Sequence, residues 1–199
     1  ASVSNPPNPE LRWERIKMVN AGIDFSSAGN VLSGSIDFFS KKGFDLIGET
    51  PFPPSSGITR FRGNTAGIRG NGIDIALNSR NIDRKFKWYS HVLFGFSRDK
   101  VTDYRYTSSA INYAQSSDGL PFPGNPIYGM YSYPWGGLSS AGDPQGYLGG
   151  TISTDYAQII SKTSAQELVF HGPSRPAYSG ALRNTLEWKG ISLSANISY

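Results

Sequence analysis

Aromatic side chains gather in one Gly- and Pro-rich segment and are the best candidates for specific binding. Aromatic faces stack on sugar rings, and a tyrosine hydroxyl adds a hydrogen-bond donor. The same residue types are enriched at protein interfaces, and they also pack the interiors of loops. The cluster therefore predicts either a binding surface or a packed loop, and its members are Tyr128, Tyr131, Tyr133 and Trp135.

The residues that could perform hydrolysis or hold a metal are too sparse for either role. His91 and His171 are the only histidines and cysteine is absent, so a zinc site would lack ligands. Glycoside hydrolysis needs two carboxyl groups about 5 to 9.5 Å apart. The glutamates show no spacing that singles out such a pair; they are Glu10, Glu14, Glu49, Glu167 and Glu187. We expect no enzyme, no metal and no cofactor.

Nucleophile and nucleotide motifs are missing as well. No Gly-x-Ser-x-Gly stands between a strand and a helix, and residues 63–72 lack the Gly-Lys-Ser/Thr ending of a phosphate loop. The net charge is +4, and the basic residues are scattered rather than clustered. This pattern gives nucleic-acid binding little support.

Alternation of apolar and polar residues is the strongest structural signal of the chain. In residues 190–199, Ile191, Leu193 and Ile197 point one way and the serines between them point the other. The same pattern predicts strands near 13–26, 31–42, 65–80, 85–98, 179–188 and 190–199. The apolar positions expected to face lipid are Val19, Ile23, Phe25, Leu32, Ile36, Phe38, Ile73, Ile75, Leu77, Ile191, Leu193 and Ile197. Asp24, Asp37 and Asp74 recur on the polar faces, as a hydrated lumen requires.

The connections between these strands alternate between short and long. Loops are predicted over 43–64, which is rich in Pro, Gly and Ser, and over 99–178. Outer-membrane barrels have short periplasmic turns and long external loops, with aromatic girdles at both interfaces. We therefore predict an all-β, antiparallel transmembrane β-barrel segment, with Trp88 and Trp188 in an interface girdle.

Composition agrees with a barrel and excludes a helical membrane protein. Only every second residue of a barrel strand meets lipid, so the mean hydropathy of -0.35 is compatible with a membrane wall. No window approaches the roughly 20 apolar residues that a membrane helix needs. About six strands cannot close such a barrel, and an open edge in lipid leaves backbone groups unpaired. We expect the chain to be a piece of a longer protein.

Several short motifs, in order, carry a resemblance to a known family. They begin with Asn8-Pro9-Glu10-Leu11-Arg12-Trp13-Glu14 and continue with Gly34-Ser35-Ile36-Asp37-Phe38-Phe39 and Asn71-Gly72-Ile73-Asp74. The most specific stretch is His171-Gly172-Pro173-Ser174-Arg175-Pro176, followed by Trp188-Lys189-Gly190. Together they resemble the barrel of SusC/RagA TonB-dependent outer-membrane transporters of Bacteroidota. Trp188 stands where the family often has tyrosine.

This resemblance implies a closed barrel of about 22 strands around a plug. It implies import of large nutrients, oligosaccharides or peptides, across the outer membrane of a Gram-negative bacterium. The implied partners are the remainder of the barrel, a SusD-like lid lipoprotein, outer-membrane lipid, and TonB-ExbB-ExbD acting through the plug. The plug and the TonB box have no counterpart in these residues, so active transport is implied for the parent protein only.

One alternative of a different class shares the strand pattern. A soluble β-sandwich that binds carbohydrate would also show alternating strands and exposed aromatic residues. The two hypotheses differ in the surroundings of Ile191, Leu193 and Ile197, which contact lipid in a barrel and a second sheet in a sandwich.

Overall fold

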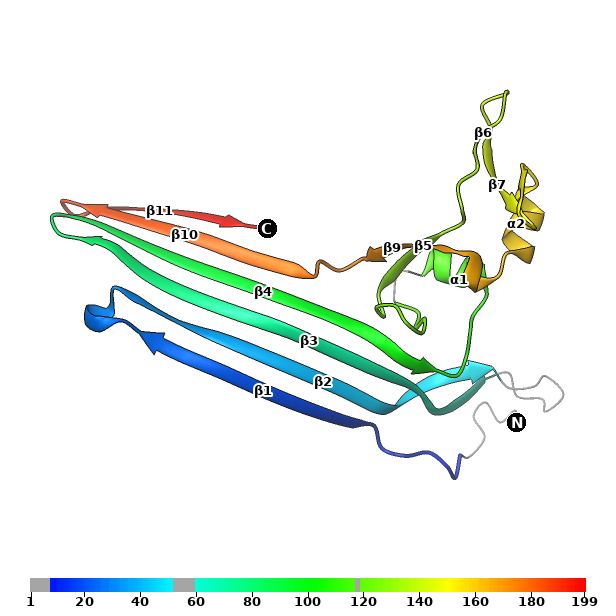
Figure 1. The fold of residues 1–199 in the computed structure, drawn as a ribbon, viewed down its shortest axis with the longest axis horizontal. Coiled ribbons are helices and arrows are strands. Elements are labelled where there is room, and N and C mark those ends of the chain that lie inside the picture. The colour runs from blue at the N-terminus through cyan, green and yellow to red at the C-terminus, as the bar shows by residue number, and fades with distance from the viewer. Residues whose placement is uncertain (1–7, 52–59, 117–118) are drawn as a thin grey trace, which may run out of the picture. The chain divides into compact units, whose positions relative to one another are not determined.

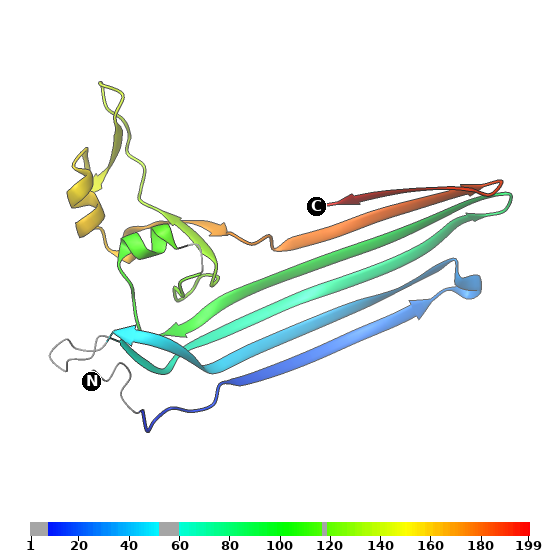
Figure 2. The same cartoon turned by 180° about the vertical axis from the view of Figure 1, so that it is seen from behind.

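Antiparallel strands dominate the computed structural model, which describes residues 8–51, 60–116 and 119–199. Six long strands form one sheet in the order β1-β2-β3-β4-β10-β11, seen from its two sides in Figures 1 and 2. Every neighbouring pair except β4 and β10 is also consecutive among the strands of the chain, and β5 to β9 lie between those two in the sequence. The bounds are β1 Arg15–Ser26, β2 Leu32–Pro51, β3 Arg60–Asp83, β4 Phe86–Tyr104, β10 Tyr178–Trp188 and β11 Ile191–Ser198.

Three short connections lie at the same end of this sheet (Figure 1). β1 joins β2 through the 3-10 helix η1, Ala28–Asn30. β10 joins β11 through Lys189 and Gly190, whose φ angles of 46° and 84° are both left-handed. Two left-handed residues in succession form the tight turn that matches the twist of a hairpin.

Two compact units can be distinguished in the chain. The sheet unit comprises Ile16–Lys42, Arg69–Asp99 and Pro176–Tyr199. The loop unit comprises Ala1–Arg15, Gly43–Ile68 and Lys100–Arg175, and its residues 1–7, 52–59 and 117–118 lie outside the described part.

The loop unit contains regular structure where the sequence predicted one long loop over 99–178. Its elements are α1 Ala110–Gln115, β5 Gly129–Ser132, β6 Gly137–Leu138, β7 Pro144–Leu148, β8 Thr151–Ser153, α2 Tyr156–Lys162, the 3-10 helix η3 Ala165–Glu167 and β9 Val169–Pro173. β5 pairs with β9, and β6, β7 and β8 form a second small sheet. These elements are too short to show a periodic apolar pattern, so they could not be predicted from the sequence.

Local side-chain hydrogen bonds begin both short helical turns after β8. The Asp155 carboxylate accepts the Gln158 amide at 3.1 Å at the start of α2. The Glu167 carboxylate accepts the Ser164 amide at 2.7 Å, completing a capping box at η3. Hydrogen bonds from Ser164 lower the pKa of Glu167, so this carboxylate is ionised at neutral pH.

The loop predicted over 43–64 is shorter in the structure, because β2 continues to Pro51 and β3 begins at Arg60. Asp45 lies within β2 with a φ of 54°, and this left-handed residue interrupts the alternation by which the sequence defines a strand. The Asn64 side-chain amide donates to the Asp45 carbonyl at 2.5 Å and thereby joins the irregular position to β3. The proline-rich residues 52–59 of that prediction lie outside the described residues.

A small aromatic core holds the loop unit together. Tyr113, Tyr131 and Ala165 are buried, and Leu120, Phe122 and Leu168 pack against them. Among the residues that the structure describes, no helix has the length and apolar character needed to cross a membrane.

Candidate functional site

Strand register divides the side chains of the sheet unit between two faces. Leu182 of β10 lies opposite Ile197 of β11 on one side and Val92 of β4 on the other. These three residues therefore share a face, called here the apolar face. Its further members on the same strands are Phe86, Trp88, Phe94, Leu186, Trp188, Ile191 and Leu193.

The opposite face, called the polar face, carries the aspartates of the strands. A Cβ atom on Gly22 would meet the Asp37 carboxylate, and one on Gly95 would meet Asp74. Gly22, Asp37, Asp74 and Gly95 therefore lie on one side of the sheet. Because neighbours in a strand point to opposite faces, Ile23 and its counterparts in β2 and β3 lie on the apolar face.

The aliphatic side chains of the apolar face are open rather than packed in a core. Ile23, Ile191, Leu193 and Ile197 are 69%, 70%, 66% and 69% exposed. Contiguous exposed apolar surface of this kind marks a protein or membrane contact. A β-sandwich would bury these positions against a second sheet, whereas a barrel would expose them to lipid. Lipid contact at the individual positions stays a prediction.

Polar groups on the apolar face bond to one another. Asn184 Oδ1 accepts the Trp88 indole Nε1–H at 2.9 Å and the Ser90 hydroxyl at 2.6 Å. The Asn81 side-chain amide in turn donates to Ser90 Oγ at 2.7 Å. A face in contact with hydrocarbon needs such internal pairing, because lipid offers no hydrogen-bonding partner. The chain places Trp88 and Trp188 near the short connections, as a girdle requires, and the girdle itself stays a prediction.

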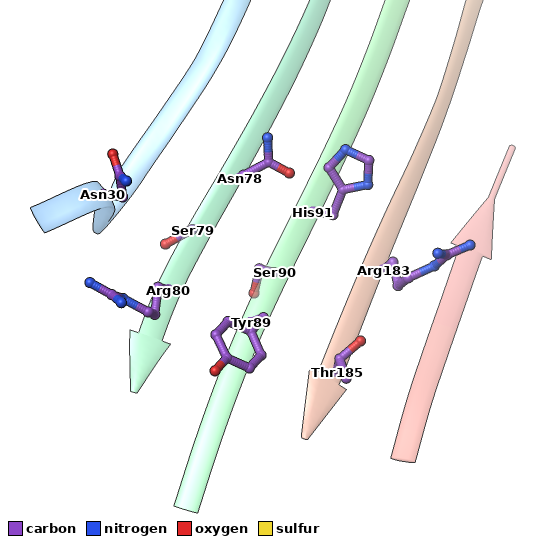
Figure 3. Close-up of a pocket in the computed structure, with 9 residues that line it drawn as sticks. All are labelled: Asn30, Asn78, Ser79, Arg80, Tyr89, Ser90, His91, Arg183 and Thr185. Atoms are coloured by element: carbon purple, nitrogen blue, oxygen red, sulfur yellow. The ribbon is translucent and has the colours of Figure 1, made fainter. Parts of the chain in front are cut away.

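A shallow pocket of about 290 Å³ opens on the polar face. Figure 3 shows Tyr89 and His91 of β4 between Asn78 and Arg80 of β3 and the side chains of Arg183 and Thr185 of β10. The remaining lining residues are Asn30, Ser79 and Ser90. Arg183 lies directly opposite His91, and Thr185 opposite Tyr89.

The pocket is cationic and rich in hydrogen-bonding groups. Two arginines line it, and none of its lining residues is a carboxylate. Arg80 is held by an ion pair to Asp83 at 3.1 Å and also donates to the Gly29 carbonyl. Such a surface suits carbonyl and carboxylate groups of a polypeptide. In the described part of the chain no group of three or more His, Cys, Asp and Glu side chains is arranged to hold a metal.

Tyr131, one of the four aromatic candidates, is a core residue of the loop unit. It is 9% exposed, and its ring lies 5.7 Å from Tyr113, 5.6 Å from Phe122 and 5.5 Å from Phe170 between centroids. Its hydroxyl accepts the Asn125 side-chain amide at 3.1 Å. Burial raises the pKa of Tyr131, so the hydroxyl is protonated at neutral pH.

The other three candidates lie in separate surroundings. The Arg175 guanidinium lies 3.4 Å from the ring centroid of Tyr128. The Tyr133 hydroxyl donates to the Ile160 carbonyl at 3.5 Å, whereas Trp135 is 64% exposed. Within the described residues no ring contact joins two of the four candidates. Ligand contact by these residues stays a prediction, and Trp135 has the greatest open surface.

Sequence reasoning missed several exposed apolar residues on the elements that follow Trp135. Leu138 on β6, Ile152 on β8 and Tyr156 on α2 are 62%, 55% and 47% exposed. Tyr147 of β7 lies opposite Ile152, and the Tyr156 hydroxyl donates to the Pro144 carbonyl at 2.8 Å. Leu138 lies opposite Pro144 and therefore on the other face of this small sheet. The exposed residues Trp135, Tyr147 and Ile152 are called here the hairpin patch. Their sequence spacing gave no signal, because the turns of β6–β8 gather them.

The predicted aromatic cluster spans residues 128–135 and therefore leaves out three further rings of the loop unit, which are Tyr113, Phe122 and Phe170. A survey of every aromatic residue between 99 and 178 would have included them. They pack the loop core, so the aromatic richness of this segment serves structure as well as surface.

An antiparallel sheet with one apolar and one polar face, joined by short turns at one end, defines a segment of a membrane β-barrel. The chain belongs to the family described as TonB dependent receptor-like, beta-barrel, whose sequence profile matches residues 1–199. The sequence-based resemblance to the SusC/RagA group and the predicted fold class are thereby confirmed.

Curated relatives of this chain are receptors rather than enzymes. TonB-dependent receptor P3 of Formosa agariphila is 24% identical over 202 residues, covering 94% of this chain and 20% of that protein. TonB-dependent receptor SusC of Bacteroides thetaiotaomicron is 24% identical over 123 residues, covering 60% of this chain and 12% of that protein. The chain thus spans about a fifth or less of the length of these relatives.

Solved structures share the fold. The RagAB peptide transporter matches with a TM-score of 0.74 and 22% identity over 99% of this chain and 22% of that chain. The RagAB peptide importer in its open-open state matches with the same TM-score over 100% of this chain.

Proposed function

We propose that this chain forms part of the wall and outer loops of an outer-membrane, TonB-dependent importer of large nutrients. The observation that carries the proposal is the exposed apolar face, on which Ile191, Leu193 and Ile197 lie in register with Leu182 and Leu186. The family match supports the class of protein. The relatives, all from Bacteroidota, support an outer membrane as its location.

The polar face would line the lumen and contact the plug domain of the full-length protein. The pocket around Arg80, His91 and Arg183 supplies donors for carbonyl and carboxylate groups of such a domain. TonB, energised through ExbB and ExbD, would act on that plug. This chain would then serve as the fixed wall against which the plug moves.

The loop unit would contact a SusD-like lipoprotein lid and the captured nutrient. The hairpin patch offers exposed aromatic and aliphatic side chains, which are the residue types enriched in the cores of protein interfaces. A partner lid is supported by the fold shared with the RagAB transporter. The nutrient would be an oligosaccharide or a peptide, and RagAB is a peptide transporter.

Paired arginine substitutions on β11 test the membrane assignment. An arginine on the lipid face of a barrel costs about 2 to 4 kcal/mol near the midplane, whereas lumen substitutions are tolerated. Ile197, opposite Leu182, lies deeper in the apolar face than the residues beside the Lys189–Gly190 turn. In the full-length protein we expect Ile197→Arg to lower the yield of folded, heat-modifiable barrel and Ser194→Arg to preserve it. Equal effects of the two substitutions would contradict the assignment, and so would solubility of the full-length protein without detergent.

Uptake tests the transport part of the proposal separately. Deletion of the TonB-contacting segment of the full-length protein should abolish growth on the imported nutrient while leaving the folded barrel in the outer membrane. Undiminished uptake after that deletion would count against an energised importer.

A further inference from the structure

Four basic residues lie on four adjacent strands, each at the end of the apolar stretch that is farther from the short turns. They are Lys17 on β1, Lys42 on β2, Arg69 on β3 and Arg98 on β4, and all four side chains are exposed. All four belong to the sheet unit. They are called here the basic row.

Contacts of neighbouring glycines place the basic row on the apolar face. A Cβ on Gly43 would touch Ile68, so the adjoining residues Lys42 and Arg69 lie level with each other on the opposite face. That face is the apolar one, because residues an even number of positions apart in a strand share a face. Lys42 is four residues from Phe38 in β2, and Arg69 is four residues from Ile73 in β3.

The outer two members are placed in the same way. A Cβ on Gly22 would meet Asp37 on the polar face, so the odd positions of β1, including Lys17, lie on the apolar face. A Cβ on Gly70 would meet Asp99, which leaves Arg98 on the apolar face of β4.

Most strand carboxylates of the sheet unit lie away from the basic row. The carboxylates of Asp24, Asp37, Asp74 and Glu187 all belong to the polar face. Asp83 lies at the opposite end of β3, where it is paired with Arg80. The basic row therefore presents exposed cations on the apolar face, toward the surroundings of the barrel.

The row lies about one membrane thickness from the short turns. From Phe86 to Arg98, β4 rises by roughly 28 Å along the membrane normal, taking about 3.3 Å per residue and a tilt of about 45°. The apolar band of such barrels is about 25 Å tall. With the short turns in the periplasm, Arg98 and its neighbours lie at the level of the outer-leaflet headgroups.

We propose that the basic row binds the phosphate groups of a phosphorylated glycolipid in the outer leaflet. The inference depends on the proposed function, since it requires the apolar face to contact the membrane. Guanidinium groups of Arg69 and Arg98 bind phosphate through paired hydrogen bonds, and the lysines add point charges. The acyl chains of the bound lipid would then lie along the exposed aliphatic side chains of the same strands.

Removal of three row cations from the full-length protein in detergent tests the inference. The row variant carries Lys42→Gln, Arg69→Gln and Arg98→Gln. The matched control carries Lys41→Gln, Lys85→Gln and Lys87→Gln, which removes the same number of cations from the polar face and the short β3–β4 turn. Binding of bisphosphorylated lipid A and of its dephosphorylated form is measured by native mass spectrometry.

We expect the row variant to bind bisphosphorylated lipid A at least tenfold more weakly than the wild type and the control. The dephosphorylated lipid should bind all three proteins weakly and equally. Unchanged lipid A binding by the row variant, or an equal loss in the control, overturns the proposal. Displacement of lipid A by equimolar inorganic phosphate would also overturn it, because the site would then recognise free phosphate.

Heat-modifiable mobility in gels separates this inference from the proposed function. If both variants form folded barrels and the row variant binds lipid A as tightly as the wild type, the lipid-binding proposal is wrong. The membrane assignment then stands. If even the wild type fails to form a detergent-dependent barrel, the proposed function itself fails.

Discussion

The Trp88 indole of β4 and the Asn184 side chain of β10 are joined by a 2.9 Å hydrogen bond, although 96 positions separate them in the sequence. Asn184 Oδ1 also accepts the Ser90 hydroxyl, so one amide oxygen satisfies two donors on the apolar face. This bond ties together two strands that are neighbours in the sheet but are separated along the chain by the whole loop segment.

Loss of this acceptor should destabilise the barrel. Asn184→Ala leaves the Trp88 and Ser90 donors without that partner, and loss of an intramolecular hydrogen bond costs about 0.5 to 1.5 kcal/mol. We expect the free energy of unfolding of the full-length protein in lipid vesicles to fall within that range in urea titrations. Asn196→Ala on the polar face is the control and should change stability by less than about 0.5 kcal/mol. Equal effects would mean that the shared acceptor does not stabilise the fold.

Two glycines of β3 should differ sharply in their tolerance of alanine. A Cβ on Gly72 would overlap the Phe39 ring and the Phe96 carbonyl, whereas on Gly70 the nearest atom would be 3.6 Å away. Overpacking costs about 1 to 3 kcal/mol. Gly72→Ala should therefore lower the folded yield or the urea midpoint, and Gly70→Ala should leave both unchanged. A tolerant Gly72 would show that the sheet can separate locally from Phe39.

These glycines also show how far the sequence could predict the structure. Glycine within a strand is typical of a bend, a bulge or a close approach of another group, and only the structure shows that Gly72 accommodates the Phe39 ring of the adjacent strand. The alternation around Ile191 and Leu193 indicated the two faces because period-2 patterning is local. By contrast, β2 beyond Lys42 was missed because Asp45 breaks the alternation, and the hairpin patch arises only when the turns of β6–β8 fold.

Tyr131 should be more important for loop stability than for recognition. Tyr131→Ala removes a ring that contacts three others, and such truncations cost about 3 to 5 kcal/mol. We expect hydrogen exchange of α1 and β9 amides to accelerate at least tenfold. Tyr131→Phe loses only the bond from Asn125 and should cost about 1 kcal/mol. Tyr147→Ala, at a half-exposed ring of the same unit, is the control and should leave exchange in α1 unchanged.

Trp135 provides the test that separates a packed loop from a docking surface. Its ring is 64% exposed, so truncation removes little internal packing. Tryptophan anchors at interfaces cost about 2 kcal/mol or more when truncated, which is at least about tenfold in affinity. Trp135→Ala should therefore weaken co-purification of the lid lipoprotein about tenfold without altering the urea midpoint of the barrel.

Val169→Ala, at an exposed aliphatic position outside the hairpin patch, should leave lid retention unchanged. If lid retention persists while nutrient uptake falls, Trp135 contacts the nutrient instead; if both persist, the hairpin patch has no docking role.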